Sequence, residues 1–310
     1  MIEFSEAPPT HPFASNTQSS ATMPSKNGFA LQDRDIELLH YVFQLRLATI
    51  DHISALSGRS IRALWNRLLK LKQRRYLTSV TRFMEKQVYA IGPEGVNAMI
   101  EQGYAPKDMA AKRLRHNELT ELGIRHALFI ADIHTRLILL TRTGPVALDH
   151  WQKGLSLWES VQPHGGPVLP IRPDAYFILK HRGRPEGKNT FHVFLEADRS
   201  TMAHTGMAAK IAGYLAYYEQ RRHTKKYPGM QGFLVATVTQ TRTRAEELRK
   251  GLYPLIPHDA ARQAYLFTAF GDLTPSSLLP KAAAAGAVGL TQAAVSSGPS
   301  ALDGRESRLW

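Results

Sequence analysis

The chain has 310 residues, no cysteine and a formal net charge of +13. Without cysteine there are no disulfides and no cysteine-ligated zinc sites, and no apolar run approaches the roughly 18 residues that a membrane span needs. So positive a charge favours a polyanionic partner, nucleic acid before an anionic membrane.

Both ends of the chain have the composition of disordered tails. Residues 1–30 are rich in Pro, Ser, Thr and Asn, and residues 282–310 are biased to Ala, Gly and Ser. The first residues lack the basic and then apolar segments of a signal peptide, so we expect a cytoplasmic protein without membrane attachment. The length between the tails suits two domains, which we place at residues 31–108 and 109–281.

Residues 31–108 are predicted to begin with three helices. The first follows an acidic turn at Asp33 and Asp35. Thr49 is a suitable N-cap for a short second helix that Gly58 ends, and Ser60 caps the third. The apolar residues of the third helix are expected to face inward; they are Ile61, Leu64, Leu68 and Leu71.

A β-hairpin with a polar turn at residues 84–87 is predicted next, and a further helix closes the region. Three helices followed by a hairpin is the order of a winged helix-turn-helix, in which the third helix enters the major groove of DNA and the hairpin lies along the backbone. We therefore predict that this region binds double-stranded DNA. Because such modules often bind paired half-sites, a homodimer is a further expectation, which nothing in the sequence fixes.

The segment from Arg59 to Lys86 has nine basic residues and one acid. Arg62 and Asn66 lie off the apolar stripe near the start of the third helix, where base edges are usually contacted, and the later basic residues suit phosphates. The alternative, a merely solvated basic face, is less favoured because the charge coincides with the motif. The predicted DNA contacts are Arg59, Arg62, Asn66, Arg67, Lys70, Lys72, Arg74, Arg75, Arg82 and Lys86.

Residues 109–281 are predicted to be a mixed α/β domain, so the whole chain is of the α+β or α/β class. A long helix over residues 116–140 has a broad apolar stripe that includes Leu122 and Leu140. Two or three strands, a second long helix capped by Ser200 or Thr201, and then a strand, a helix and a strand follow.

Three carboxylates are predicted to meet at one edge of this second region. Glu196 and Asp198 end a buried strand and lie two residues apart, so they point to the same face. Asp174 begins the preceding strand; if the two strands form a hairpin, it lies beside the end of the second. Lys210, in the following helix, is within reach if the start of that helix packs there.

Carboxylates beside a lysine suit Mg²⁺ or Mn²⁺, and such a metal would activate water for phosphodiester cleavage. The metal ligands would be Asp174, Glu196 and Asp198, with Lys210 completing a catalytic set. The alternative is structural, because strand-end carboxylates often cap helices or pair with arginine. The sequence leaves both open.

Histidines and tyrosines of this region have simpler interpretations. His126 and His134 are two turns apart on a mainly apolar helix, so a buried or hydrogen-bonded role is favoured over metal ligation. Tyr214, Tyr217 and Tyr218 are expected to pack as aromatics and not to act as nucleophiles, because the cluster of histidine ligands that accompanies a relaxase tyrosine is missing.

The residues Pro173-Asp174 and Glu196-Ala197-Asp198, on consecutive strands after a long helix, resemble the PD-(D/E)-x-K nuclease core. This resemblance implies a restriction-endonuclease-like domain. The sequence departs from the motif where the usual lysine, two residues after the acid, is Asp198. Lys210 would have to replace it from the helix.

From about residue 31 to 270 the chain resembles the plasmid replication-relaxation family more specifically. The resemblance is carried by LQDRDIELLHYVFQLRLATIDHI, YAIGPEGVNAM, WESV, RPDAYFIL, FLEADRST and KIAGYLAYY. It implies a DNA-binding protein of a plasmid or other mobile element, acting in replication, relaxation or transfer with other proteins of those processes. The alternative function is a metal-dependent endonuclease or nickase that the winged helix targets to DNA.

Overall fold

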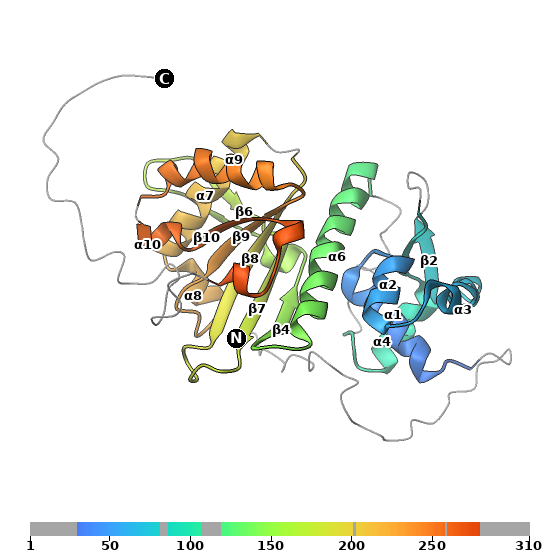
Figure 1. The fold of residues 1–310 in the computed structure, drawn as a ribbon. Coiled ribbons are helices and arrows are strands. Elements are labelled where there is room, and N and C mark those ends of the chain that lie inside the picture. Colours follow the sequence, from blue (N-terminus) through green and yellow to red (C-terminus); the bar gives the residue numbers. More distant parts are fainter. Residues whose placement is uncertain (1–29, 81–85, 107–118, 201–202, 258, 280–310) are drawn as a thin grey trace, which may run out of the picture.

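The computed structural model describes residues 30–80, 86–106, 119–200, 203–257 and 259–279. These residues form a mixed α/β structure in which a group of helices with a small sheet lies beside a five-stranded sheet (Figure 1). We call residues 30–106 the N-terminal part and residues 119–279 the C-terminal part. The expected tails lie outside the described residues, apart from Ala30, and so does the expected boundary near residue 108. No helix within the described ranges has both the length and the apolar character needed to cross a bilayer.

The N-terminal part has the predicted order of three helices, two strands and a closing helix. Its elements are α1 (Asp33–Leu45), β1 (Ala48–Thr49), α2 (Ile50–Ser57), α3 (Ile61–Gln73), β2 (Leu77–Val80), β3 (Val88–Ile91) and α4 (Pro93–Glu101). The two-residue strand β1 pairs with β3, so the hairpin becomes a three-stranded antiparallel sheet with the order β1-β3-β2.

The helix ends of this part follow from local chemistry, and the three predicted capping residues are confirmed. The Thr49 backbone N–H donates to Nδ1 of His52 at 3.0 Å at the start of α2. Gly58 ends the helix in the left-handed region, at φ 70°, where a residue without Cβ is least strained. The hydroxyl of Ser60 accepts from the backbone N–H of Ala63 at 3.3 Å and caps α3.

One part of the α3 prediction is wrong. Leu64, Leu68 and Leu71 are buried as expected, but Ile61 has a relative exposure of 46%. At 100° per residue, Ile61 lies to one side of the line through the three leucines, so the first turn of the helix leaves it at the surface.

The C-terminal part is built on one five-stranded sheet. Its strands have the order β10-β9-β8-β7-β4, in which β10, β9 and β8 are parallel and the other two pairings are antiparallel. These strands are β4 (Val146–Gln152), β7 (Ala175–His181), β8 (Thr190–Asp198), β9 (Leu234–Thr239) and β10 (Tyr265–Ala269). A separate two-stranded ribbon contains β5 (Glu159–Val161) and β6 (Leu169–Ile171).

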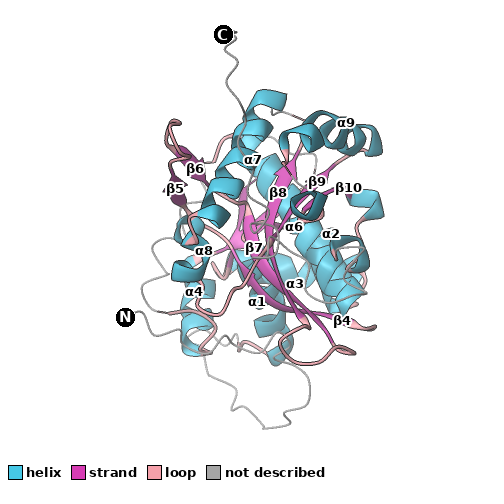
Figure 2. Cartoon of the chain, turned by 90° about the vertical axis from the view of Figure 1, so that its left-hand side faces the viewer, coloured by secondary structure: helices cyan, strands magenta, loops and turns pink. Residues whose placement is uncertain are grey.

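Helices cover both faces of this sheet. They are α6 (Glu121–Thr141), α7 (His204–Glu219), α8 (Arg222–Lys226), α9 (Arg242–Leu252) and the short α10 (Asp259–Arg262). Helix α6 lies between the sheet and the N-terminal helices, whereas α7 and α9 lie on the opposite side of the sheet (Figures 1 and 2). The predicted cap of the second long helix is wrong: α7 begins at His204 with Ala203 as its N-cap.

Helix α6 contributes to more than one hydrophobic core. Ile133 and Leu137 belong to the core around the large sheet, whereas Ala131 packs with α1, α2 and α3. Leu122 and Leu140, expected in its buried stripe, have relative exposures of 66% and 38%. The apolar pattern is broad because the helix packs on two sides, so no single stripe describes it.

Polar contacts also join α6 and its neighbours to the N-terminal part. Nε2 of His52 lies 2.7 Å from a carboxylate oxygen of Asp132 on α6. The ammonium of Lys153 donates to the carbonyl of Leu45 at 3.0 Å, and Arg142 donates to the carbonyl of Leu56. Both carbonyls lie in the last turn of a helix, where backbone acceptors are unsatisfied and cations are favoured.

Candidate functional site

The outer face of α3 carries three of the ten residues predicted to bind DNA. Arg62, Asn66 and Lys70 are spaced by four, so they share one side of the helix, and all three are exposed. Lys72 is half-buried, and Arg74 and Arg75 are exposed where the helix ends. Within the described ranges, Arg62, Lys70 and Lys72 form no ion pair with an acid, so their charges are available to a ligand.

Three of the predicted DNA contacts instead pair with acids of the same chain. Arg59 forms an ion pair of 3.0 Å with Glu37, and Lys86 one of 2.8 Å with Asp51. Arg67 donates to both carboxylate oxygens of Asp35, which is fully buried. Arg82 lies outside the described residues. Sequence reasoning missed these partners, because each acid lies on an earlier helix, well before its base in the chain.

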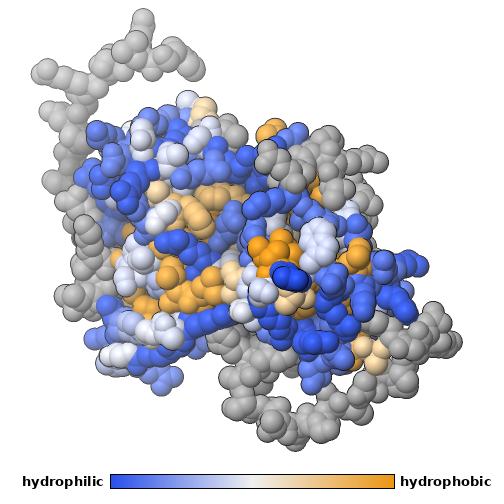
Figure 3. Space-filling view, turned by 45° about the vertical axis from the view of Figure 1, so that its right-hand side comes forward, coloured by the Kyte–Doolittle hydropathy of each residue, from blue (hydrophilic) through white to orange (hydrophobic). Residues whose placement is uncertain are grey.

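A groove of about 230 Å³ runs between α1 and α3 beside this face. Its walls are cationic and include Arg34, Arg59, Asn66, Arg67 and Lys70. The side of the molecule on which the N-terminal part comes forward is mostly hydrophilic, with patches of hydrophobic surface among the polar side chains (Figure 3). The hydrogen-bonding face of α3 therefore borders a hollow in which Arg59 and Arg67 are paired with acids, whereas Lys70 forms no ion pair within the described ranges.

Two glycines fix the turn that follows α3. The backbone carbonyls of Arg75 and Tyr76 would lie only 2.2 Å and 2.1 Å from a Cβ placed on Gly92 and Gly95, respectively. No side chain fits at such distances, so these glycines let the start of α4 press against the turn between α3 and β2. The two glycines of the GPEG sequence therefore serve close packing of the backbone.

The acidic residues of the C-terminal part lie on neighbouring strands, as predicted. Strands β7 and β8 pair antiparallel with Ala175 opposite Leu195, and the Asp174 backbone N–H donates to the Leu195 carbonyl at 2.9 Å. The start of β7 therefore lies beside the end of β8, and Asp174 comes to the edge where Glu196 and Asp198 end their strand.

Glu196 is almost completely buried, with 4% of its side chain exposed, and it points to α7. One carboxylate oxygen accepts from the hydroxyl of Tyr214 at 2.6 Å and the other from the Lys210 ammonium. Burial raises the pKa of Glu196 to about 7, although the Lys210 charge opposes this shift and that of Asp174 adds to it. The predicted proximity of Glu196 and Lys210 is confirmed.

Asp198 faces the same side and pairs with α9. Its carboxylate accepts from Nε of Arg244 at 2.8 Å and from the backbone N–H of Ser200 at 3.1 Å. Two arginines that lie nearer to the acids in the sequence, Arg172 and Arg199, form no ion pair with them among the described residues; Arg172 lies over the ring of Trp158, with 4.7 Å to its centroid.

Asp174 is held by strand β8 and by helix α6. One oxygen accepts from the backbone N–H of Ala197 at 2.8 Å, and the other lies 2.8 Å from Nε2 of His126 on α6. The hydrogen bond to Asp174 raises the pKa of His126, although burial opposes the shift. The hydrogen-bonded role predicted for His126 is thus confirmed, and its partner is one of the three acids.

These contacts leave the three acids poorly arranged for a metal ion. Each carboxylate is already bound by a protein cation or a donor group. Over the described part of the chain, no three His, Cys, Asp or Glu side chains form a group that could hold a metal. In this arrangement the residues predicted as ligands of Mg²⁺ or Mn²⁺ therefore do not fit the ion.

Three residues of this cluster were not assigned to it from the sequence. Tyr214 and His126 were predicted only to be packed or hydrogen-bonded, and Arg244 was not singled out. Of the three, only Tyr214 could have been assigned to the cluster from its spacing, because it follows Lys210 by four residues and so lies on the same side of α7. The side chain of Tyr214 is fully buried, and Tyr217 and Tyr218 are also buried, as the aromatic interpretation requires.

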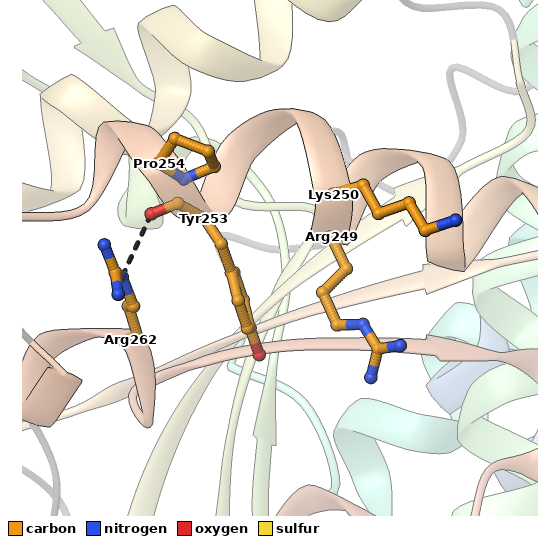
Figure 4. A pocket seen from close by; sticks show the side chains of 5 residues that line it. All are labelled: Arg249, Lys250, Tyr253, Pro254 and Arg262. Atoms are coloured by element: carbon orange, nitrogen blue, oxygen red, sulfur yellow. Dashed lines mark hydrogen bonds between the residues drawn. The ribbon is translucent and has the colours of Figure 1, made fainter.

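A second basic pocket lies far from α3. It has a volume of about 320 Å³ and is lined by Arg249, Lys250, Tyr253, Pro254 and Arg262 (Figure 4). Nε of Arg262 donates to the carbonyl of Tyr253 at 3.1 Å. The pocket is at the end of α9, on the other side of the molecule from α3 (Figure 1).

Comparison with known proteins places most of this architecture in one family. Residues 39–232, more than half of the chain, match the family described as replication-relaxation. The match begins inside α1 and ends before β9, so it includes α3 and all three acids of the large sheet. No curated protein and no solved structure matches the chain significantly.

Proposed function

Since the chain belongs to the replication-relaxation family, we propose that it binds double-stranded DNA of a plasmid or other mobile element and acts in the replication, relaxation or transfer of that DNA. Residues 31–108 form a winged helix-turn-helix domain in this proposal. Helices α2 and α3 are the helix-turn-helix, and the β2–β3 hairpin is the wing. Residues 109–281 form a nuclease-like domain that serves assembly with other replication or transfer proteins.

The observation that carries the proposal is the outer face of α3. Arg62, Asn66 and Lys70 lie on one exposed side of a helix that contains no acidic residue. Arginine and asparagine make bidentate hydrogen bonds to guanine and adenine in the major groove, and lysine neutralises phosphate. The net charge of +13 adds attraction to any nucleic acid, independent of its sequence.

Binding is favoured over cleavage as the activity. The metal-dependent alternative needs carboxylates that are open to a cation, whereas Glu196 is closed by Lys210 and Tyr214, and Asp198 by Arg244. The lysine that the nuclease motif would use to assist catalysis forms an ion pair with the acid itself.

Fluorescence anisotropy with duplexes from the element's own replication origin tests the proposal. Arg62→Ala should reduce the preference for the cognate duplex over a scrambled one, because a base contact is lost. Lys72→Ala should weaken binding to both duplexes alike and lower the slope of log Kd against log salt by about one.

Lys250→Ala is the matched control for these variants. It also removes one positive charge, but at the pocket on α9, far from α3 (Figure 1). If Arg62→Ala and Lys72→Ala bind both duplexes like the parent, α3 is not the DNA-binding helix. If Lys250→Ala weakens binding as much as Lys72→Ala, net charge alone explains the affinity.

A further inference from the structure

Helix α3 carries an exposed apolar ridge beside its basic face. Ile61, Trp65 and Leu69 are spaced by four residues, so they line one side of the helix. Their relative exposures are 46%, 54% and 45%. Large apolar side chains placed together at the surface lose the free energy of burial unless something covers them, so such a ridge marks a contact surface.

A hydrogen-bonding ridge runs parallel to the apolar one. Each of its members, Arg62, Asn66 and Lys70, directly follows a member of the apolar ridge in the sequence, so the two ridges lie about 100° apart around the helix. The outward half of α3 is therefore divided lengthwise into an apolar strip and a polar, cationic strip.

The occupant of such a surface must offer negative charge and exposed apolar groups side by side. The major groove of DNA does so: it admits an α-helix, it is bordered by phosphates, and each thymine presents its C5 methyl group there beside purine hydrogen-bonding edges. A second copy of the chain fits worse, because two α3 helices in contact would bring Arg62, Lys70 and Lys72 against the same charges on the partner.

We propose that Ile61, Trp65 and Leu69 contact thymine methyl groups in the major groove and thereby select a thymine-containing site, while Arg62 and Asn66 bind the neighbouring base edges. This inference rests on the proposed function, that α3 binds double-stranded DNA. It adds that the preferred DNA site contains thymines placed so that their methyl groups meet the apolar ridge. Trp65 is the principal specificity residue, since it is the largest and most exposed of the three.

Replacement of thymine by uracil tests the inference, because it removes the methyl group and leaves base pairing unchanged. The probe is the tightest duplex selected by the full-length chain from a randomised pool, prepared once with thymine and once with uracil at every thymine position. The wild-type chain should bind the uracil duplex more weakly, by about fourfold for each contacted methyl group. Trp65→Ala should reduce this difference, and Ile61→Ala should reduce it less.

Trp158→Ala is the matched control. Trp158 is exposed to a similar extent, 46%, but lies in the C-terminal part, so its removal should leave the thymine–uracil difference at the wild-type value. Circular dichroism of each variant confirms folding, and sedimentation at the same concentrations reports the oligomeric state.

Several results would overturn the inference without overturning DNA binding. These are a selection that returns no preferred sequence, equal affinity of the wild type for both duplexes, and loss of the difference in Trp158→Ala as well. A wild-type dimer that Trp65→Ala dissociates, with no change in the thymine–uracil difference, would assign the ridge to a second copy. If the wild type binds no duplex at all, the proposed function itself fails.

Discussion

Arg67 of α3 donates from Nε and a terminal nitrogen to both carboxylate oxygens of Asp35 of α1. Asp35 is completely buried, and one of its oxygens also accepts from the backbone N–H of Gln32 at 2.8 Å. The pair joins the start of the first helix to the middle of the third. It holds α3 in place, while the neighbouring Arg62 points outward without an ion pair inside the described ranges.

Arg67→Ala should therefore destabilise the protein strongly. Removing one partner leaves a buried carboxylate without its counter-ion, which typically costs about 3–5 kcal/mol of unfolding free energy. Urea denaturation followed by circular dichroism measures the change. Arg62→Ala is the control, and it should stay within about 0.5 kcal/mol of the parent because the side chain is exposed. Equal losses in the two variants would show that the Asp35 pair has no special role.

The sequence predicted the helices around this pair better than it predicted the pair. Thr49, Gly58 and Ser60 were found because capping depends on residues adjacent in the chain. Arg67 was grouped with the DNA contacts, because charge density alone does not reveal that a base meets an acid 32 residues earlier. Helical periodicity failed at Ile61 for a related reason: the amount of a helix face that is buried depends on its neighbours in space.

The sequence predicted where the three acids lie, but it did not predict which side chains contact them. Alternation along β8 placed Glu196 and Asp198 on one face, and the antiparallel pairing with β7 brought Asp174 beside them. The contacts that decide their chemistry come from three helices, through His126, Lys210 and Arg244. The side chains that reach an acid from helices distant in sequence depend on tertiary packing, which periodicity does not encode.

The ion pair of His126 and Asp174 should make stability depend on pH. Its hydrogen bond raises the pKa of His126 above the usual 6.5. The stabilisation is therefore fully present below about pH 6.5 and is lost as the pH rises through the raised pKa. Urea denaturation of the parent and of His126→Gln across pH 5.5 to 8 should show a stability difference that is largest at the acidic end.

His164→Gln is the control for this measurement. His164 is exposed and lies outside the cluster, so the free energy of unfolding of His164→Gln should differ little from that of the parent at each pH. A parent-minus-His126→Gln difference that grows toward pH 8 would mean that the histidine is held neutral in the folded state, contrary to the expected direction of its pKa shift.

Glu196 should give a pH dependence through its buried carboxyl. Because burial raises its pKa from 4.5 to about 7, the stability that it contributes is present below about pH 4.5 and is lost as the pH rises to about 7. Glu196→Gln cannot ionise, so it should gain stability relative to the parent as the pH rises over this interval. Urea denaturation at pH 4.5, 6 and 7.5 measures the gain.

Glu121→Gln is the matched control, because Glu121 is 45% exposed and pairs with Arg125 at the surface of α6. The free energy of unfolding of Glu121→Gln should differ little from that of the parent at all three pH values. If Glu196→Gln instead loses stability relative to the parent as the pH rises, the Lys210 charge outweighs burial and keeps Glu196 ionised in the folded protein.

The closed arrangement of the acids also predicts that the protein does not cut DNA. Supercoiled plasmid carrying the element's own origin should be nicked no faster with the wild type and Mg²⁺ or Mn²⁺ than with the metal alone. Asp174→Asn and Glu196→Gln should give the same background, since Glu196 is occupied by Lys210 and Tyr214 in the parent. Agarose gels resolve supercoiled, nicked and linear forms, and anisotropy on the same samples verifies that the protein binds the plasmid origin.

Metal-dependent nicking by the wild type that both substitutions abolish would contradict this prediction. It would mean that the Lys210 ion pair opens and that the three acids rearrange into a metal site when DNA binds.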